Sequence, residues 1–234
     1  MTASRFVRYQ LRTTDPEAAR GFYAGVVGGQ IWGPDVEAGP LAAAALVRGA
    51  RPHWLGHIGV TDVETTMGRL AAQGARQLGP DERTADGCLR VALRDPFGAI
   101  VALQSGPAPV SRGQVVWHAL SVADHRPAFA AYSALFGWQA LDEVTFPEPV
   151  GKTQLFGWDQ SGKAVGSVAE SARFAGVHEH WMFFFHVRNV AAAVAQARAR
   201  GGLANEPMPT PRGDLVAACD DPQGAAFGLY QIGS

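Results

Sequence analysis

Residues 7–29 read VRYQLRTTDPEAARGFYAGVVGG, and residues 116–138 read VWHALSVADHRPAFAAYSALFGW. At an offset of 109 residues Asp15 aligns with Asp124, Tyr23 with Tyr132, and Gly28 with Gly137. An Asp before a helical pattern and a Gly after it are common capping residues of an α-helix. The two stretches therefore predict the same strand–helix unit, present twice in the chain.

Two further blocks repeat in the same order. HWLGHIGVTDVETTMGRLAAQGA at residues 53–75 matches HWMFFFHVRNVAAAVAQARARGG at residues 180–202 at an offset of 127, and RDPFGAIVALQ at 94–104 matches DDPQGAAFGLYQ at 220–231 at an offset of 126. The offset grows by about 18 residues after the first helix, which predicts an insertion at that point of the second copy.

The repeat also predicts where the chain divides. We expect a first module at residues 1–106, a linker at 107–113 and a second module at 114–234. The linker lies within SGPAPVSRG, a stretch rich in Pro, Gly and Ser, as is typical of connections between domains.

Each copy predicts the same order of elements: a strand, a helix, a variable middle segment, a strand that begins with His-Trp, a second helix, and a closing hairpin with an Asp-Pro-x-Gly turn. The second helices are expected at Val63–Gln73 and Val190–Arg200. The middle segment is expected to be hairpin-like in both copies, short at residues 30–47 and longer in copy two, with a turn at residues 159–162. This pattern predicts an α+β fold.

Composition excludes several classes of protein. The chain has 47% hydrophobic residues, and its 20 basic and 21 acidic side chains give a net charge of −1, so no charge excess favours nucleic acid or an anionic membrane surface. No apolar run is long enough for a membrane helix, and no secretory signal is visible. Cys88 and Cys219 show no metal-type spacing and suit a reducing compartment. We expect a cytoplasmic monomer or weak homodimer.

The motifs TTDPEAARGFYAGVVGG, VTDVETTMGRLAAQGA and DPFGAIVAL each have a counterpart in the second half. Together they resemble the vicinal oxygen chelate superfamily, which contains glyoxalase I, bleomycin-resistance proteins and extradiol dioxygenases, and in particular its two-module, glyoxalase-like bacterial members. The resemblance covers nearly the whole chain. It implies tandem βαβββ modules with helices outside, whose curled mixed sheets form a cup around a ligand.

The resemblance further implies a divalent metal, held by His or Glu at three positions of a module. Those positions carry Arg8, Leu55 and Ala102 in copy one, and Trp117, Met182 and Gly228 in copy two. None of these side chains is a ligand for a hard divalent ion, which prefers carboxylate, imidazole or carbonyl donors. We therefore expect neither a metal ion nor another cofactor.

Strand alternation predicts the side chains that share the cup face with those positions. The candidate ligand-binding residues are Arg8, Gln10, Arg12, His57, Trp117, Phe184, His186 and Tyr230. Arginines suit a carboxylate or phosphate, aromatic rings suit a planar ligand, and His57 and His186 are the candidates for acid–base catalysis. Each side chain also has a structural reading, as a solvated arginine, a hydrogen-bonded core histidine or a packed aromatic.

Three functions remain open. The first, which we favour, is a protein that binds a small molecule in the cup without the usual metal ligands. The alternative is an enzyme of the lyase, isomerase or hydroxylase type that uses His57, His186 and the arginines, or a non-standard metal site. The third is an interaction or regulatory protein whose cup is filled by its own side chains.

Overall fold

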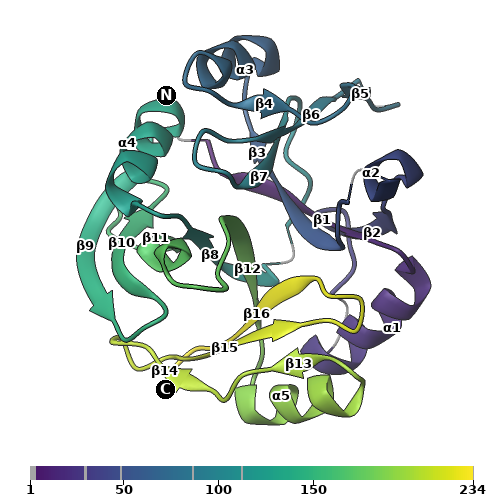
Figure 1. Cartoon of the computed structure of the whole chain (residues 1–234), viewed down its shortest axis with the longest axis vertical. Coiled ribbons are helices and arrows are strands. Elements are labelled where there is room, and N and C mark those ends of the chain that lie inside the picture. Colours follow the sequence, from purple (N-terminus) through teal and green to yellow (C-terminus); the bar gives the residue numbers. More distant parts are fainter. Residues whose placement is uncertain (1–3, 29–30, 48, 86, 112, 234) are drawn as a thin grey trace. The chain divides into compact units, whose positions relative to one another are not determined.

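A computed structural model describes residues 4–28, 31–47, 49–85, 87–111 and 113–233. The fold is α+β, with two mixed sheets that each come from one half of the chain (Figure 1). This agrees with the tandem arrangement expected from the repeat. The exact module boundaries at residues 106 and 114 stay a prediction, and residue 112 of the linker lies outside the described ranges.

The first sheet has the strand order β2-β1-β3-β7-β6-β4, with β5 paired to β6. Its strands are β1 (Phe6–Thr13), β2 (Val36–Pro40), β3 (His53–Gly59), β4 (Arg76–Gln77), β5 (Glu82–Arg83), β6 (Leu89–Arg94) and β7 (Ile100–Gln104). The β1·β2 and β3·β7 pairs are parallel, and the β6·β7 pair is antiparallel.

The second sheet has the order β13-β15-β16-β12-β8-β11-β10-β9, with β14 paired to β15. Its strands are β8 (Val115–Ser121), β9 (Gln139–Phe146), β10 (Gly151–Gly157), β11 (Gly166–Ala169), β12 (His180–His186), β13 (Leu203–Ala204), β14 (Met208–Pro209), β15 (Leu215–Asp220) and β16 (Ala226–Gln231). The extra length of copy two forms the antiparallel β9·β10 pair.

The helices match the prediction with two exceptions: the second helices end at Ala71 and Ala199 rather than at Gln73 and Arg200, and a short helix in the middle segment of copy one was not expected. They are α1 (Pro16–Val27), α2 (Ala43–Val47), α3 (Val63–Ala71), α4 (His125–Phe136) and α5 (Val190–Ala199), with a 3₁₀ turn η1 at Glu170–Arg173. Asp15 caps α1 by accepting a hydrogen bond from the Ala18 backbone N–H at 3.0 Å, and Asp124 accepts one from Arg126 at the start of α4. No helix in the described ranges has the length and apolar composition that a membrane crossing requires.

The middle segment of copy one differs from the prediction. The expected hairpin at residues 30–47 is wrong: β2 runs parallel to β1, and the chain then forms the short helix α2. The alanine-rich run before Val47 has a high helix propensity, and within the described residues 31–47 the only strand is β2, so no hairpin forms there. In copy two the predicted turn is confirmed, because Asp159 accepts a hydrogen bond from the Ser161 N–H and Gly162 has φ 74°.

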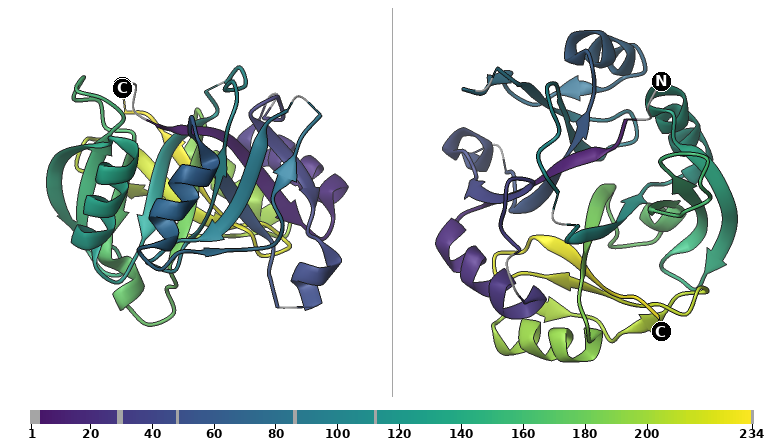
Figure 2. Two further views of the ribbon diagram at one scale, coloured as in Figure 1. Left: turned by 90° about the horizontal axis from the view of Figure 1, so that it is seen from above. Right: turned by 180° about the vertical axis from the view of Figure 1, so that it is seen from behind.

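The residue contacts divide the chain into two compact units, and each draws on both copies. The first contains the described residues of 1–8, 56–108 and 118–181, and the second contains those of 9–55, 109–117 and 182–234. In the second unit, α1 and α5 lie side by side, as Figures 1 and 2 show. In the first, α4 packs against β10 and β11.

A buried chain of hydrogen bonds fixes the first unit. The indole N–H of Trp181 donates to the Tyr132 hydroxyl at 3.1 Å, and this hydroxyl donates to Asp95 Oδ2 at 2.7 Å. The other carboxylate oxygen of Asp95 accepts from the Phe97 and Ala99 N–H groups, both at 2.9 Å. Asp95 therefore holds the Asp-Pro-x-Gly turn of copy one against a helix of copy two.

The second unit contains the same arrangement with the copies exchanged. The Trp54 N–H donates to the Tyr23 hydroxyl at 2.8 Å, which donates to Asp221 Oδ2 at 3.2 Å. Burial raises the pKa of Asp221, and it raises the pKa of Tyr23 well above its usual value. The tyrosine therefore remains a hydrogen-bond donor at neutral pH. The repeated Tyr, His-Trp and Asp-Pro motifs thus have a structural role.

The first unit also buries a histidine in an aromatic cluster. The His118 ring stacks on Phe6, with centroids 5.1 Å apart and planes 4° from parallel, and meets the edge of Trp158. Its Nδ1 lies 2.8 Å from the Val165 carbonyl oxygen, a distance at which a neutral ring donates. Burial lowers the pKa of His118 to about 4.

We predict that Tyr132→Phe lowers the free energy of unfolding by about 2–3 kcal/mol, because it leaves a buried carboxylate oxygen and an indole N–H without their partner. Tyr23→Phe should cost a similar amount, since it breaks the equivalent chain. Urea denaturation measures both. A loss below about 1 kcal/mol in either variant contradicts the role given to the chain.

We predict that His118 makes the protein acid-sensitive. Its folded pKa lies below the unfolded value of 6.5, so its contribution is complete above pH 6.5 and is lost as the pH falls towards 4. The loss amounts to about 3 kcal/mol. Urea denaturation from pH 7 to pH 4 should show a smaller loss for His118→Phe than for the wild type, whereas a control variant at the exposed His178, His178→Phe, should keep the full loss.

Candidate functional site

Four of the candidate residues gather on one strand face of the second unit, which we call the aromatic face: Trp117 of β8, Phe184 and His186 of β12, and Tyr230 of β16. Exposure alternates along β12 as predicted. Met182, Phe184 and His186 are half-buried, whereas Trp181, Phe183 and Phe185 are buried. The half-buried side of β12 therefore presents an aromatic ring and an imidazole.

The rings of the aromatic face are held by direct contacts. The Trp117 and Tyr230 rings stack with centroids 6.0 Å apart and planes 25° from parallel. His186 is the register partner of Tyr230 in the parallel β12·β16 pair. The Tyr230 hydroxyl donates to Asp214 Oδ2 at 2.5 Å, and burial, followed by this hydrogen bond, raises the pKa of Tyr230. Tyr230 is thus a fixed, protonated phenol.

Phe184 lies against the backbone of β16. Phe184 pairs with Gly228, and a Cβ atom at Gly228 would overlap Cδ1 of the Phe184 ring. Any side chain at Gly228 would therefore collide with the ring. In copy two, a phenyl ring occupies the space beside the last-strand position where the resemblance implies a metal ligand.

The candidates from copy one lie in both units. Gln10 and Arg12 belong to the second unit, where Gln10 Oε1 accepts from Arg12 Nε at 3.1 Å. Arg8 and His57 belong to the first, where His57 is 2% exposed and is the register partner of Ala102. Arg8 is half-buried, like Gln10 and Arg12. The structure thus groups the aromatic candidates, but not all of the polar ones.

The side chains at the expected metal positions do not fit a metal ion. Leu55 and Ala102 are buried hydrocarbons, and Gly228 has no side chain. Arg8 is a cation, and Trp117 and Met182 offer no hard donor. Within the described residues, no group of three or more His, Cys, Asp or Glu side chains is placed to hold a metal.

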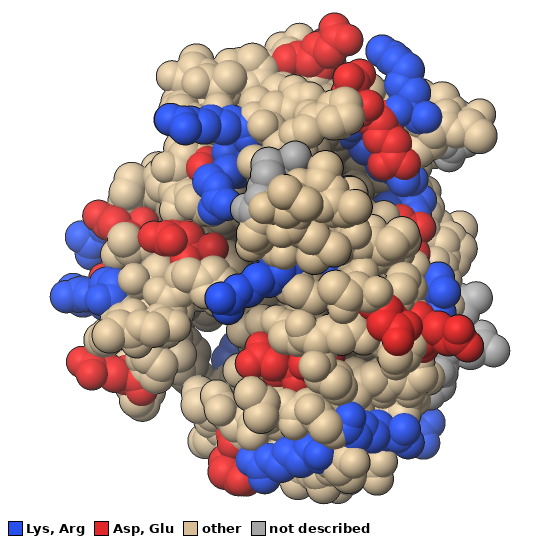
Figure 3. Space-filling model, turned by 45° about the vertical axis from the view of Figure 1, so that its right-hand side comes forward, with Lys and Arg blue, Asp and Glu red and all other residues tan. Residues whose placement is uncertain are grey.

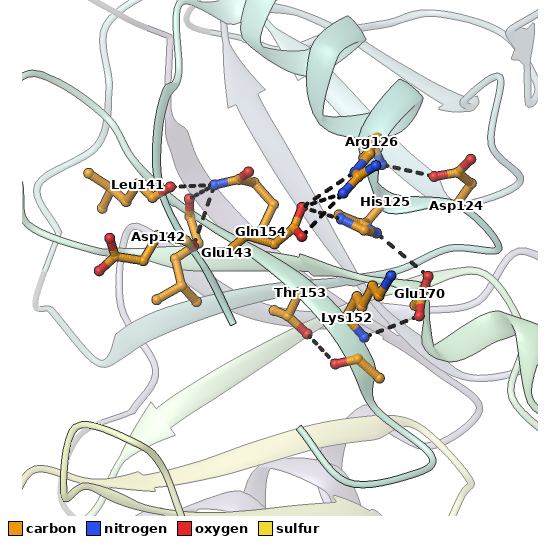
Figure 4. A network of polar contacts seen from close by, with 12 residues as sticks. Asp124, His125, Arg126, Leu141, Asp142, Glu143, Lys152, Thr153, Gln154 and Glu170 are labelled. Carbon is orange, nitrogen blue, oxygen red and sulfur yellow. Dashed lines mark hydrogen bonds and ion pairs between the residues drawn. The ribbon is translucent and has the colours of Figure 1, made fainter. Parts of the chain in front are cut away.

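The first unit contains a polar network that the sequence did not reveal (Figure 4). His125, the first residue of α4, is 3% exposed, and its Nε2 lies 3.0 Å from Glu143 Oε2. On its other side, Nδ1 lies 3.8 Å from Glu170 Oε2. Arg126 also reaches Glu143, at 3.3 Å, and hydrogen bonds from His125 and Arg126 lower the pKa of Glu143.

This network joins three elements of copy two. Glu143 lies on β9 and Glu170 begins η1, so His125 connects α4 to both. The Glu170 carboxylate also bonds to the Lys152 N–H at 3.3 Å and to Arg173 at 3.0 Å. One difference between the copies pointed to His125, since copy one has Pro16 at the equivalent position. The two glutamates lie after the first helix, in the lengthened region of copy two, where the sequence offers no equivalent position in copy one.

A family model matches residues 114–229, and its description is Glyoxalase/Bleomycin resistance protein/Dioxygenase superfamily. Residues 114–229 belong to this superfamily. The match covers β8 to β15 and the first part of β16, and so includes Trp117, Phe184 and His186 of the aromatic face but not Tyr230. The glyoxalase-like, vicinal oxygen chelate resemblance seen in the sequence motifs is thereby confirmed.

Related proteins extend this similarity to the whole chain. "Putative glyoxylase CFP32" of Mycobacterium bovis is 28% identical over 249 residues, covering 94% of this chain and 92% of the relative. The 2,3-dioxygenase LapB of Pseudomonas sp. KL28 superposes with a TM-score of 0.65 at 16% identity, covering 100% of this chain and 94% of that structure. The Mn(II)-bound glyoxalase of Novosphingobium aromaticivorans gives 0.61 at 13% identity, covering 98% and 82%. At these identities the two structures share the superfamily fold with this chain.

We predict that His125→Leu lowers the free energy of unfolding by about 1–3 kcal/mol, because the largely buried Glu170 carboxylate then faces an apolar side chain and Glu143 loses a donor. The same substitution at the exposed His178 is the control and should change stability by less than about 0.5 kcal/mol. Chemical denaturation compares the two variants. Equal stabilities would mean that the network does not hold α4.

Proposed function

We propose that this glyoxalase-like chain binds a small planar aromatic molecule on the aromatic face and does so without the usual metal ligands. The observation that supports this most directly is the set of rings on neighbouring strands: Trp117 and Phe184 are half-buried, and Trp117 stacks on the buried Tyr230. Aromatic rings prefer stacked or edge-on partners, and fixed rings lose little conformational entropy on binding.

The polar groups at the aromatic face would orient such a ligand. His186 is half-buried and can donate to or accept from a hydroxyl or carboxylate substituent, depending on its protonation state. Asp214 holds the Tyr230 hydroxyl, so that hydroxyl keeps only its lone pairs for a further partner. The expected ligand is a ring with one polar substituent, contacted by Trp117 and Phe184, with Gln10 and Arg12 as further candidates in the same unit.

The second candidate function is an enzyme of the lyase, isomerase or hydroxylase type. The observation in its favour is the accessible imidazole of His186 beside the ring of Tyr230 in the β12·β16 register. A general base must reach a substrate proton, and the half-buried His186 meets that condition more readily than His57, which is 2% exposed.

Partners and location form part of the same proposal. We propose a cytoplasmic monomer or weak homodimer with no nucleic-acid or membrane partner. Basic and acidic side chains are interspersed on the face that Figure 3 displays, in keeping with the net charge of −1. Such a surface offers no extended positive field to a phosphate backbone.

The test is binding of 4-hydroxybenzoate by saturation-transfer NMR and calorimetry, with cyclohexanecarboxylate as the non-planar control. We expect the aromatic acid to bind more tightly, and Trp117→Ala to weaken it about tenfold because a stacking partner is lost. Val110→Ala, which shortens an apolar side chain that is 80% exposed, is the matched control and should bind normally. Equal binding of both acids, or unchanged binding by Trp117→Ala, would refute the proposal.

Turnover distinguishes the two functions. Under the binding proposal the aromatic acid is recovered unchanged after long incubation. The enzymatic function replaces the binding one if the wild type forms a product, His57→Ala still forms it, and His186→Ala does not form it but still binds the aromatic acid.

A further inference from the structure

We propose that copy one also carries an anion-binding site, formed by Arg76 and Arg94 and separate from the aromatic face. Arg76 of β4 and Arg94 of β6 are direct cross-strand partners in the antiparallel β4·β6 pair, so their side chains leave the sheet on the same side. Both line a cavity of about 420 Å³ in the first unit, together with Leu78, Pro96, Gly74 and Gly98.

The charge arrangement at this cavity is unbalanced. Like charges placed directly opposite each other across strands destabilise a sheet. Among the described residues, no ion pair joins Arg76 or Arg94 to an acidic side chain, and Arg94 only donates to the Gly98 carbonyl, at 2.6 Å. This cross-strand pair therefore carries two positive charges with no ion-pair partner among the described residues.

The carboxylate that lines the cavity, Asp95, does not supply a counter-charge. Asp95 is 3% exposed, and its oxygens already accept from the Tyr132 hydroxyl and from two backbone N–H groups. The Glu179 side chain lies next to Gly98: its Cβ and Cγ atoms are 3.1 Å from the position that a Cβ atom on residue 98 would occupy. In the described structure Glu179 nevertheless forms no ion pair with Arg76 or Arg94. Both guanidinium groups are therefore available to an anion from solution.

The chemistry of the pair selects the class of ligand. Each guanidinium presents a planar fork of N–H donors that matches a carboxylate or a phosphate group, and two forks can share one such group. Leu78 and Pro96 add an apolar wall beside it. Both arginines are exposed, so the affinity should be modest and should fall as salt is added.

Copy two provides an internal comparison. The positions equivalent to Arg76 and Arg94 are Leu203 and Asp220, which pair in the same way between β13 and β15. The two copies thus keep the same strand pairing, but only copy one has two cations there. The paired arginines are therefore not required by the shared fold.

The experiment is a titration of the full chain with inorganic phosphate and, separately, with malonate, followed by amide shifts of Gly74 and Gly98 in ¹H–¹⁵N NMR spectra. We expect saturable shifts in the millimolar range that weaken with added NaCl, and at least about tenfold weaker binding by R76Q/R94Q. R69Q/R83Q removes the same charge from two exposed arginines outside the cavity wall and should bind like the wild type.

The outcomes separate cleanly. Amide shifts that do not saturate would overturn the site. An equal loss of affinity in R76Q/R94Q and R69Q/R83Q would also overturn it, because binding would then depend on net charge alone. Tighter binding of phosphate than of malonate assigns the site to phosphorylated ligands, and the reverse order assigns it to carboxylates. Trp117→Ala should leave these titrations unchanged, so the result is independent of the aromatic face.

Discussion

The buried Trp–Tyr–Asp hydrogen-bond chain is the interaction on which both units depend. In each unit, one copy supplies the tryptophan that opens a strand and the tyrosine of a first helix, while the other supplies the aspartate of the turn. The same aspartate holds its own turn through backbone N–H groups. Because all these polar groups are buried, each is costly to leave unpaired, so helix, strand and turn are fixed together.

The two copies share this hydrogen-bonded scaffold but differ in the side chains at equivalent positions of their strands. Arg8 and His57 of copy one correspond to Trp117 and Phe184 of copy two, so one copy carries basic groups where the other carries rings. Gly228 shows how the backbone adapts, since it makes room for the Phe184 ring. The duplicated fold thus carries different chemistry at equivalent positions, half-buried rings in copy two and a half-buried arginine and a buried histidine in copy one.

Local patterns predicted much of the fold and part of the site. The capping residues Asp15 and Asp124, the Asp-Pro-x-Gly turns and the alternation of β12 all agree with the structure, because each depends on residues close in the chain. In β3, both faces are covered, so His57 is buried although its strand was expected to line an open face. The network at His125 escaped prediction because its glutamates lie 18 and 45 residues away along the chain.

The sequence by itself determined the duplication, the α+β class, the order of most elements and the unsuitability of the expected metal positions, since spacing and residue type are local properties. Only the tertiary structure decided that each compact unit combines segments of both copies, that the repeated Tyr, Trp and Asp form one hydrogen-bonded chain, and that Trp117 meets Tyr230. The physical reason is that hydrogen bonds and ring contacts are made between groups brought together by burial, and residue spacing does not specify which distant groups meet.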